Sequence, residues 1–282
     1  MSRAVSVRHG AFGRTALYRL DRPIVTHAHR EGHLIFYVDG ETALVDINGS
    51  PRPLSDSTGV AVSPWEPHNF RVRTGSSCLC LVLYIKPIWF LENSPSAEFA
   101  LQFGANSVQM TPQLQSLVLQ LTTLLLEEEA VDEFDHLLFA LIKLCFDQTW
   151  HRRPSPSLMA RATLNFSDFR VRRSLRLMQE CVSVDVDVDS LARQVGLSRP
   201  HFFKLFKLQT GVTPNIYLNT LRSEQAIHDL LNSEKTVTNI AEELGFSSQA
   251  SFTRFFSSNV GIAPSEYRRV ARVDTSAFPM VS

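Results

Sequence analysis

The sequence lacks long apolar segments and has few cysteines. No apolar run reaches the roughly 18 residues that a membrane-spanning helix needs, and the N-terminal residues do not show the charged-then-apolar pattern of a signal peptide. Only four of the 282 residues are cysteine, which suits a reducing compartment. Cys78 and Cys80 alternate with leucines, so we expect buried thiols on a strand rather than a zinc site. We expect a cytoplasmic protein that does not contact a membrane.

The chain also lacks net charge, because 28 Lys and Arg balance 28 Asp and Glu. The two halves differ, however. Residues 1–150 carry 11 basic against 16 acidic residues, a difference of −5, whereas residues 151–282 carry 17 against 12, a difference of +5. A basic C-terminal half is compatible with a nucleic-acid partner, although five charges alone are weak support. The length of the chain suits two domains.

The first 150 residues change their pattern near Thr111. Residues 24–86 alternate apolar and polar positions in short segments separated by turn residues, which indicates an antiparallel sandwich or a small barrel. Residues 111–130 and 132–150 instead repeat apolar positions every three to four residues and predict an antiparallel helix pair. Four leucines of the first helix either form a dimer seam or pack onto their own domain: Leu117, Leu121, Leu124 and Leu125.

Residues 151–168 mix Pro, Ser and Arg without a period, and we expect the linker between the two domains there. The predicted fold is α+β with two domains. Its parts are an antiparallel β-barrel at 1–110, a helical pair at 111–150, a linker at 151–171 and an all-α domain at 172–282.

The C-terminal half contains one helical unit twice. Residues 191–217 align with residues 240–267 at an offset of 49, which becomes 50 after one additional turn residue. Such a duplication indicates an internal structural repeat. Eight pairs of positions are identical: Ala192 and Ala241, Gly196 and Gly245, Ser198 and Ser248, Phe202 and Phe252, Phe206 and Phe256, Gly211 and Gly261, Pro214 and Pro264, and Tyr217 and Tyr267.

Each copy has the pattern of a helix, a glycine turn and a second helix. Gly196 and Gly245 follow amphipathic segments, where a residue with positive φ can end a helix without steric cost. Ser198 in the first copy, and Ser247 or Ser248 in the second, are suited to cap the next helix. Two short helices joined in this way form a helix-turn-helix, whose second helix can enter the major groove of DNA.

The second copy separates an apolar stripe from a polar one. Its phenylalanines share one side of the helix with Phe246, so we expect Phe252, Phe255 and Phe256 in the core. The opposite stripe offers Gln and Arg, which pair bidentately with adenine and guanine edges. The alternative, an ordinary solvated helix face, is weakened by the duplication. The residues on this stripe are Gln249, Ala250, Thr253 and Arg254.

The segments "SLARQVGLSRPHFFKLFKLQTGVTPNIYLNTLRSEQAIHDLL" and "VTNIAEELGFSSQASFTRFFSSNVGIAPSEYRR" resemble the AraC/XylS family of transcription regulators, over about residues 172–270. The resemblance implies two recognition helices joined by a long helix near 216–231. In the second copy it implies DNA contacts by Gln249, Ala250, Ser251, Thr253 and Arg254. In the first copy it implies base contacts by Pro200, Phe203 and Lys204, with Arg199 and Lys207 nearer the phosphates.

The first copy departs from the usual chemistry of a base reader. Pro200 has no donor, and Phe203 has no hydrogen-bonding group. Phe203 can still contact a thymine methyl group, and proline is tolerated in the first turn of a helix. We therefore expect reading by this helix to depend on Lys204 and on apolar contact.

Histidines gather in the N-terminal half. "THAHREGHLIFYVDG" and "SPWEPHNF" resemble the cupin pattern H-x-H-x3-E-x6-G followed by P-x-G-x2-H, with His33 at the glutamate position and Trp65 at the second glycine position. Polar pocket residues for a small effector, a divalent transition-metal site and purely structural histidines all remain open. The first of these predicts five effector-binding residues inside the barrel: His27, His29, His33, Tyr37 and His68.

Together these features predict a sequence-specific transcription regulator that binds promoter DNA and responds to a small molecule. By resemblance to the family we expect an activator that contacts RNA polymerase, that can form a homodimer, and that is not an enzyme. We expect no cofactor, with a divalent metal at the barrel histidines as the minor alternative. A metal-dependent cupin dioxygenase or isomerase fused to a DNA-binding module is the second interpretation. A nucleoid-type binder without sequence preference is a third.

Overall fold

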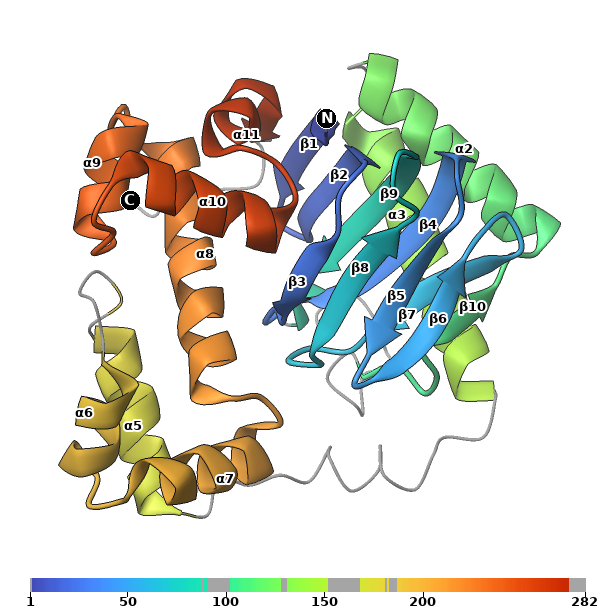
Figure 1. Cartoon of the computed structure of the whole chain (residues 1–282). Coiled ribbons are helices and arrows are strands. Elements are labelled where there is room, and N and C mark those ends of the chain that lie inside the picture. The colour runs from blue at the N-terminus through green and yellow to red at the C-terminus, as the bar shows by residue number, and fades with distance from the viewer. Residues whose placement is uncertain are drawn as a thin grey trace, which may run out of the picture.

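The computed structural model describes residues 2–87, 89–90, 102–127, 131–151, 168–180, 182 and 187–273. Two β-sheets face each other and form the barrel-like N-terminal domain (Figure 1). One sheet has the order β10-β7-β4-β9-β2-β1-β11 and the other the order β3-β8-β5-β6. The strands are β1 (Arg3–Gly10), β2 (Gly13–Leu20), β3 (Ile24–His27), β4 (Gly32–Gly40), β5 (Ala43–Ile47), β6 (Ser50–Leu54), β7 (Thr58–Val62), β8 (His68–Val72), β9 (Cys78–Ile85), β10 (Ser107–Gln109) and β11 (Ala271–Val273).

The central strands of the larger sheet are buried on both faces. Ile35 and Val82 point into the core between the two sheets, whereas Leu34 and Leu83 point to the opposite face. That opposite face is covered by the predicted helix pair, now α2 (Pro112–Glu127) and α3 (Val131–His151) (Figure 1). Cys78, Cys80 and Cys145 are buried free thiols, as expected, and Cys181 lies outside the described residues.

The leucines considered for a dimer seam pack onto their own domain. Leu121 and Leu125 are buried against the larger sheet, and Leu117 and Leu124 are partly buried in the same cluster. The opposite side of α2 carries the exposed leucines, Leu119 at 65% and Leu126 at 53%.

The C-terminal domain consists of two helical units joined by one long helix (Figure 1). We call α5–α7 the first unit and α9–α11 the second unit. Residues 152–167, which make up most of the expected linker, lie outside the described residues. Helix α5 begins at Phe169, before residue 171, where we expected the linker to end. No helix in the described ranges is both long and apolar enough to span a membrane. The helices are α5 (Phe169–Glu180), α6 (Val188–Gln194), α7 (Arg199–Thr210), α8 (Pro214–Asn232), α9 (Val237–Glu243), α10 (Gln249–Val260) and α11 (Pro264–Val270).

Equivalent turns shape both units. Gly196 and Gly245 have φ of 72° and 79°, so each supplies the left-handed residue that a side chain would strain. Ser248 caps α10 through a reciprocal capping box with Ser251. Ser198 occupies the equivalent cap of α7, but its side chain makes no capping hydrogen bond. The two turns therefore have the same backbone conformation, but only the recognition helix of the second unit has a hydrogen-bonded N-cap.

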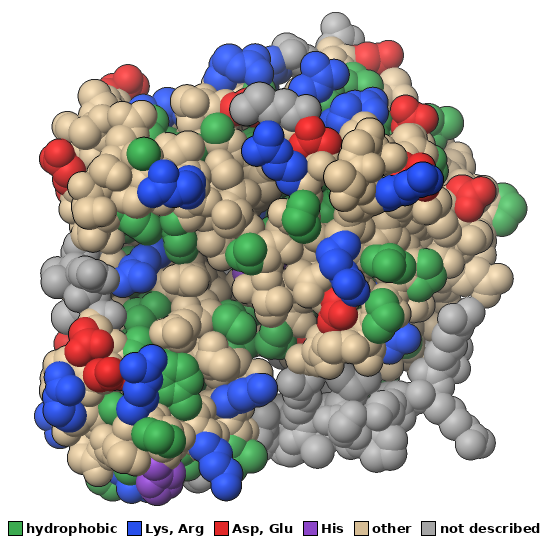
Figure 2. Space-filling view, viewed as in Figure 1, with side chains coloured by type: hydrophobic (Ala, Val, Ile, Leu, Met, Phe, Trp, Pro, Cys, Tyr) green, Lys and Arg blue, Asp and Glu red, His purple; other side chains and the backbone are tan. Residues whose placement is uncertain are grey.

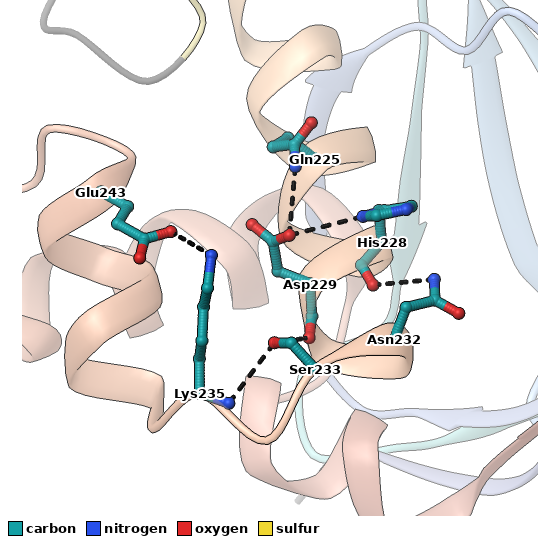
Figure 3. Close-up of polar contacts among 7 residues, drawn as sticks. All are labelled: Gln225, His228, Asp229, Asn232, Ser233, Lys235 and Glu243. Carbon is teal, nitrogen blue, oxygen red and sulfur yellow. Dashed lines mark hydrogen bonds and ion pairs between the residues drawn. The ribbon is translucent and has the colours of Figure 1, made fainter.

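The end of α8 is tied to the start of the second unit (Figure 3). The Gln225 amide donates to the Asp229 carboxylate at 3.1 Å, and the Ser233 hydroxyl donates to the Asp229 carbonyl at 2.7 Å. Lys235 then forms an ion pair with Glu243 of α9 at 2.5 Å. Arg268 of α11 donates to the Lys235 carbonyl at 2.7 Å. These bonds hold the second unit in a fixed direction relative to α8.

The second unit also packs directly on the barrel. Strand β11, which directly follows α11, pairs in parallel with β1, so that Val7 lies opposite Ala271. Glu266 accepts a hydrogen bond from the Ala4 backbone at 3.1 Å. Phe252 and Phe256 belong to the same buried cluster as the residues between the two sheets. The barrel and the second unit therefore share one continuous core.

Candidate DNA-reading helices and interdomain cavity

Helix α10 presents the predicted polar stripe to solvent. Gln249, Ala250 and Arg254 are exposed, while Phe252 and Phe256 are fully buried on the opposite side. Because these two rings anchor the helix to the core, the Arg254 side chain has a fixed point from which to extend. Among the described residues no hydrogen bond or ion pair is formed by Arg254, so its exposed guanidinium is available to a ligand.

Two other predicted readers of α10 are already engaged. The Ser251 hydroxyl donates to the Ser248 carbonyl at 2.8 Å and accepts from the Ser248 backbone amide at 3.1 Å. Gln249 accepts a hydrogen bond from the Thr238 hydroxyl at 2.8 Å. Thr253 is partly buried. Gln249 keeps its amide group as a donor, whereas Ser251 is committed to the helix cap.

Helix α7 presents a different surface. Pro200, Lys204 and Lys207 are exposed, and Phe203 is partly buried. Arg199 pairs with Asp189 at 3.0 Å and lies 5.4 Å from the centre of the Phe203 ring. This pairing competes with the phosphate contact that we predicted for Arg199. Figure 2 shows further Lys and Arg side chains over the lower-left region that contains the first unit.

The four histidines converge, although they do not share one strand: His27 ends β3, His33 lies on β4 and His29 lies in the connection between them. His27 and His68 face each other across the β3–β8 pair, with ring centres 4.3 Å apart. His29 lies 4.7 Å from His27, and His33 lies 5.1 Å from His68, both measured between ring centres. Tyr37 does not join them, because its hydroxyl donates to the Gly40 carbonyl at the outer end of β4, 2.7 Å away.

Burial keeps these imidazoles neutral. It lowers the pKa of His27 to about 4, and it lowers the pKa values of His29, His33 and His68 well below the usual 6.5. Positive charge on neighbouring groups, including Arg14, adds to the effect at His27, His29 and His33. Neutral rings each offer one donor and one acceptor, which suits either a polar ligand or a metal ion.

A cavity that adjoins the histidines lies between the domains. This cavity of about 250 Å³ is bounded by the barrel on one side and by α8 on the other. The barrel interior near His33 and His68 retains only about 30 Å³. The predicted effector space inside the barrel is therefore small, and the roomier site is at the domain boundary. Its polar lining includes Arg14, His27, His29, Asn219, Ser223 and Glu224.

Arg14, like Asn219, Ser223 and Glu224, is a residue of this cavity that the sequence did not indicate. It is 7% exposed, and its guanidinium lies 3.6 Å from the centre of the Tyr84 ring. Its Nη1 donates to the Tyr267 hydroxyl of α11 at 3.1 Å. The same hydroxyl lies 2.8 Å from the His9 Nε2 atom. A lone arginine within the apolar strand "FGRTALY" was the signal that could have revealed it.

Glu224 carries the acidic group on the α8 side. Its carboxylate pairs with Arg30 at 3.0 Å. Burial nevertheless raises the pKa of Glu224 to about 7, with the charge of Arg30 opposing and that of Glu31 adding to the shift. The Thr220 hydroxyl, one turn earlier on α8, donates to the Ala28 carbonyl of the barrel at 2.9 Å. Helix α8 is thus bonded to the segment that carries His27 and His29.

Comparison with known proteins matches this architecture. Residues 191–270 match a helix-turn-helix domain family. The chain is 30% identical over 260 residues to the HTH-type transcriptional activator RhaS of Citrobacter koseri, covering 89% of this chain and 90% of that protein. It is 29% identical over 264 residues to RhaS of Escherichia coli, with the same coverage.

Solved structures of ToxT from Vibrio cholerae share the fold over nearly the whole length. One has a TM-score of 0.58 at 14% identity and covers 91% of this chain and 97% of that one. Another, with a TM-score of 0.54, is described as bound to an unsaturated fatty acid. The two-domain architecture, the duplicated helix-turn-helix and the full-length relatives agree, and the chain belongs to the AraC/XylS family of DNA-binding transcription regulators.

Proposed function

We propose that this protein activates transcription in response to a small polar molecule bound between the barrel and α8. One observation carries the proposal. Four residues that line this cavity each carry a buried polar atom without a hydrogen-bond partner in the described part of the chain: Arg14 Nε, His29 Nε2, Ser223 Oγ and Glu224 Oε1. Unpaired buried polar atoms are costly, so the presence of four such residues around one cavity supports the proposal of a bound ligand.

The lining defines the class of ligand. Arg14 and Ser223 offer donors, Glu224 offers an acceptor, and His29 offers either according to its tautomer. A volume of about 250 Å³ holds roughly eight waters at ~30 Å³ each. This favours a small metabolite with several hydroxyl or carboxyl groups. It disfavours a long acyl chain such as the fatty acid of the ToxT complex.

Helix α8 gives such a ligand a route to the DNA-reading helices. Ser223 and Glu224 lie in the middle of α8, which joins the first unit to the second. A ligand that binds one arrangement of barrel and α8 more tightly than another shifts the population toward that arrangement. The spacing or orientation of the two recognition helices, and hence promoter affinity, changes with it.

For DNA itself, we propose that Gln249 and Arg254 read base edges and that Ala250 permits close approach of the backbone. In the first unit, Lys204 and Phe203 supply the base contacts, with Pro200 against the groove and Lys207 on phosphate. Arg199 reaches phosphate only after leaving Asp189. Thr253 lies at the partly buried edge of the polar side of α10, next to the proposed base-reading residues.

A cavity-filling substitution tests the effector site. Ser223→Leu places a larger apolar side chain in the cavity while keeping a residue suited to a helix. In thermal-shift measurements across a panel of small polyols, sugars and hydroxy acids, we expect a ligand that stabilises the wild type and loses its effect in this variant. Ser116→Leu, at an exposed position of α2, is the matched control. Equal stabilisation of all three proteins would refute the cavity as the site.

Activation further requires contact with RNA polymerase, which we propose from the named activator relatives. We also propose that a homodimer, if the promoter demands one, uses the exposed side of α2 that carries Leu119 and Leu126. Leu126→Glu would then lower the mass measured by sedimentation. An unchanged mass in a dimeric protein would assign the interface elsewhere.

A further inference from the structure

The first residue of each recognition helix is held by the helix that precedes it. Gln249 begins α10, and its Oε1 atom accepts a hydrogen bond of 2.8 Å from the Thr238 hydroxyl of α9. Arg199 begins α7, and its Nη1 atom donates to the Asp189 carboxylate of α6 at 3.0 Å. Thr238 and Asp189 are each the second residue of their helix. The same two positions are therefore in contact in both units.

The internal repeat relates these two contacts. Asp189 and Thr238 are 49 residues apart, which is the offset of the repeat before its additional turn residue. Arg199 and Gln249 are 50 residues apart, which is the offset after it. The first contact is an ion pair and the second a neutral hydrogen bond, so the packing of the two helices, and not one pair of residue types, brings these positions together. A side chain at this place in the first helix can therefore direct the first side chain of the recognition helix.

We propose that Thr238 determines which base Gln249 reads, a step that rests on the base-reading role proposed above for Gln249. A bidentate contact with adenine needs both ends of the amide at the base edge, because the oxygen accepts from N6 and the nitrogen donates to N7. The bond from Thr238 directs the Gln249 Oε1 atom toward α9 instead. Gln249 then presents to the groove only the two N–H donors of its amide nitrogen.

An amide that offers only donors fits guanine best. Guanine presents two adjacent acceptors in the major groove, O6 and N7, whereas adenine presents one acceptor beside a donor. Arg254, the other exposed reader of α10, also offers donors only. The second unit therefore selects guanine at the position that Gln249 reads, and not the adenine that a glutamine with a free amide can pair with.

Thr238 is a positioning residue, because it acts on the base only through Gln249. Both side chains are exposed in the free protein, so water competes for the bond between them. Docking into the groove removes this water, and a hydrogen bond shielded from water is stronger. A net contribution typical of one hydrogen bond corresponds to roughly a 2- to 10-fold preference for the held orientation of the amide. The effect of Thr238 on base preference should have the same size.

Binding of the full-length protein to a selected DNA site and to its single-base variants tests the proposal. Gln249→Ala identifies the base position that Gln249 reads, because the preference there should disappear. At that position the wild type should prefer guanine, and Thr238→Val should lower the ratio of guanine to adenine affinity by roughly 2- to 10-fold. Thr238→Ser, which keeps a donating hydroxyl, should retain the wild-type ratio. Thr123→Val, at an exposed position of α2, is the matched control and should also retain it.

The outcomes separate this inference from the base-reading role on which it rests. A wild type that does not prefer guanine at the identified position would overturn the inference, as would an unchanged ratio in Thr238→Val. Equal losses in Thr238→Val and Thr238→Ser would overturn it too, because the hydroxyl would not be responsible. In these cases Gln249 remains a base reader. If Gln249→Ala changes the preference at no position, base reading by Gln249 fails and the inference fails with it. A ratio of two affinities does not depend on the fraction of folded protein, so a less stable variant does not mimic these results.

Discussion

The two helix-turn-helix units are similar in sequence, yet they meet the barrel in different ways. The equivalent tyrosines show the contrast. Tyr217 packs on Phe206 and stacks on Trp65, with ring centres 4.9 Å apart. Tyr267 packs on Phe256, but its hydroxyl is bound in a buried network with Arg14 and His9. Both copies keep the tyrosine ring, but the ring stacks on Trp65 in the first unit and its hydroxyl bonds to buried polar groups in the second.

The difference extends to the size of the contact. The second unit adds β11 to the larger sheet and shares its core with the barrel, whereas the core of the first unit contacts the barrel through Ala28 and Trp65. We therefore expect a change in the barrel to reach α10 directly and α7 mainly through α8. The unit for which we propose the stronger base-reading chemistry is also the one that makes the larger contact with the barrel.

Removal of the equivalent core rings should have the largest effect on stability and should separate the two units most clearly. Phe206→Ala and Phe256→Ala should each cost roughly 3–5 kcal/mol, because both rings are fully buried. Only Phe256→Ala should also destabilise the barrel, since its cluster continues there. Urea unfolding followed separately by barrel and C-terminal fluorescent probes measures this. If both substitutions destabilise the barrel equally, the two units do not differ in how their cores are joined to the barrel.

Base reading should differ between the units as well. Arg254→Ala should lose on the order of 1–3 kcal/mol of specific binding and relax the preference at one base position. Lys204→Ala in the first unit should lose less specificity. Arg22→Ala on the barrel serves as the control, and binding is measured on selected and random DNA. If Arg254→Ala weakens both DNAs equally, Arg254 contacts phosphate instead.

Acid should weaken the attachment of the second unit. Burial, together with the charges of Arg14 and Lys86, lowers the pKa of His9 to about 3. The undocked imidazole takes up its proton near pH 6.5, so docking is fully stable above that value and loses stability as the pH falls from 6.5 toward 3. Each pH unit within this window costs at most about 1.4 kcal/mol per histidine.

Limited proteolysis between the barrel and α11 at pH 7.0 and 5.5 measures this effect. His9→Gln, which keeps a polar group beside Tyr267 but does not titrate, should reduce the pH dependence. A variant as acid-sensitive as the wild type would show that His9 is not responsible.

The smallest expected effect concerns Trp65. It has a φ of 61°, a left-handed conformation that glycine adopts more readily. Trp65→Gly should relieve this strain but lose the stacking on Tyr217, which is worth about 0.5–1.5 kcal/mol. We expect a barrel of equal or greater stability and a less protected first unit in hydrogen exchange. Unchanged protection of α7 would mean that the stacking does not attach the first unit.

Local signals made the C-terminal half predictable. Glycines at the turns, buried phenylalanines at helical spacing and a capping serine each determine the conformation of their own neighbourhood. Trp65 stands at a glycine position of the cupin-like pattern and has a φ of 61°, a conformation that we did not predict from the sequence. By contrast, β2 is buried at nearly every position, including Arg14 and Thr15, so it shows no alternation. The sequence therefore did not reveal this strand.

The cavity could not be predicted for a different reason. It forms only when residues about 200 positions apart meet, such as Arg14 on β2 and Ser223 on α8. The four histidines were identified because the two cupin-like motifs that carry them lie within one domain. Tyr37 was included by strand alternation but lies too far along β4, where its hydroxyl finds a backbone partner. Periodicity identifies the face of a strand and not the distance along it.

Footprinting of the purified protein on DNA selected from a random pool tests whether both helix-turn-helix units read DNA. If both units read DNA, each protomer should protect two major-groove segments about 10 bp apart on one face of the duplex. Arg254→Ala should weaken one segment, and Lys204→Ala the other. A single protected segment per protomer, unaffected by Lys204→Ala, would contradict the account and leave the first unit without a role in reading DNA.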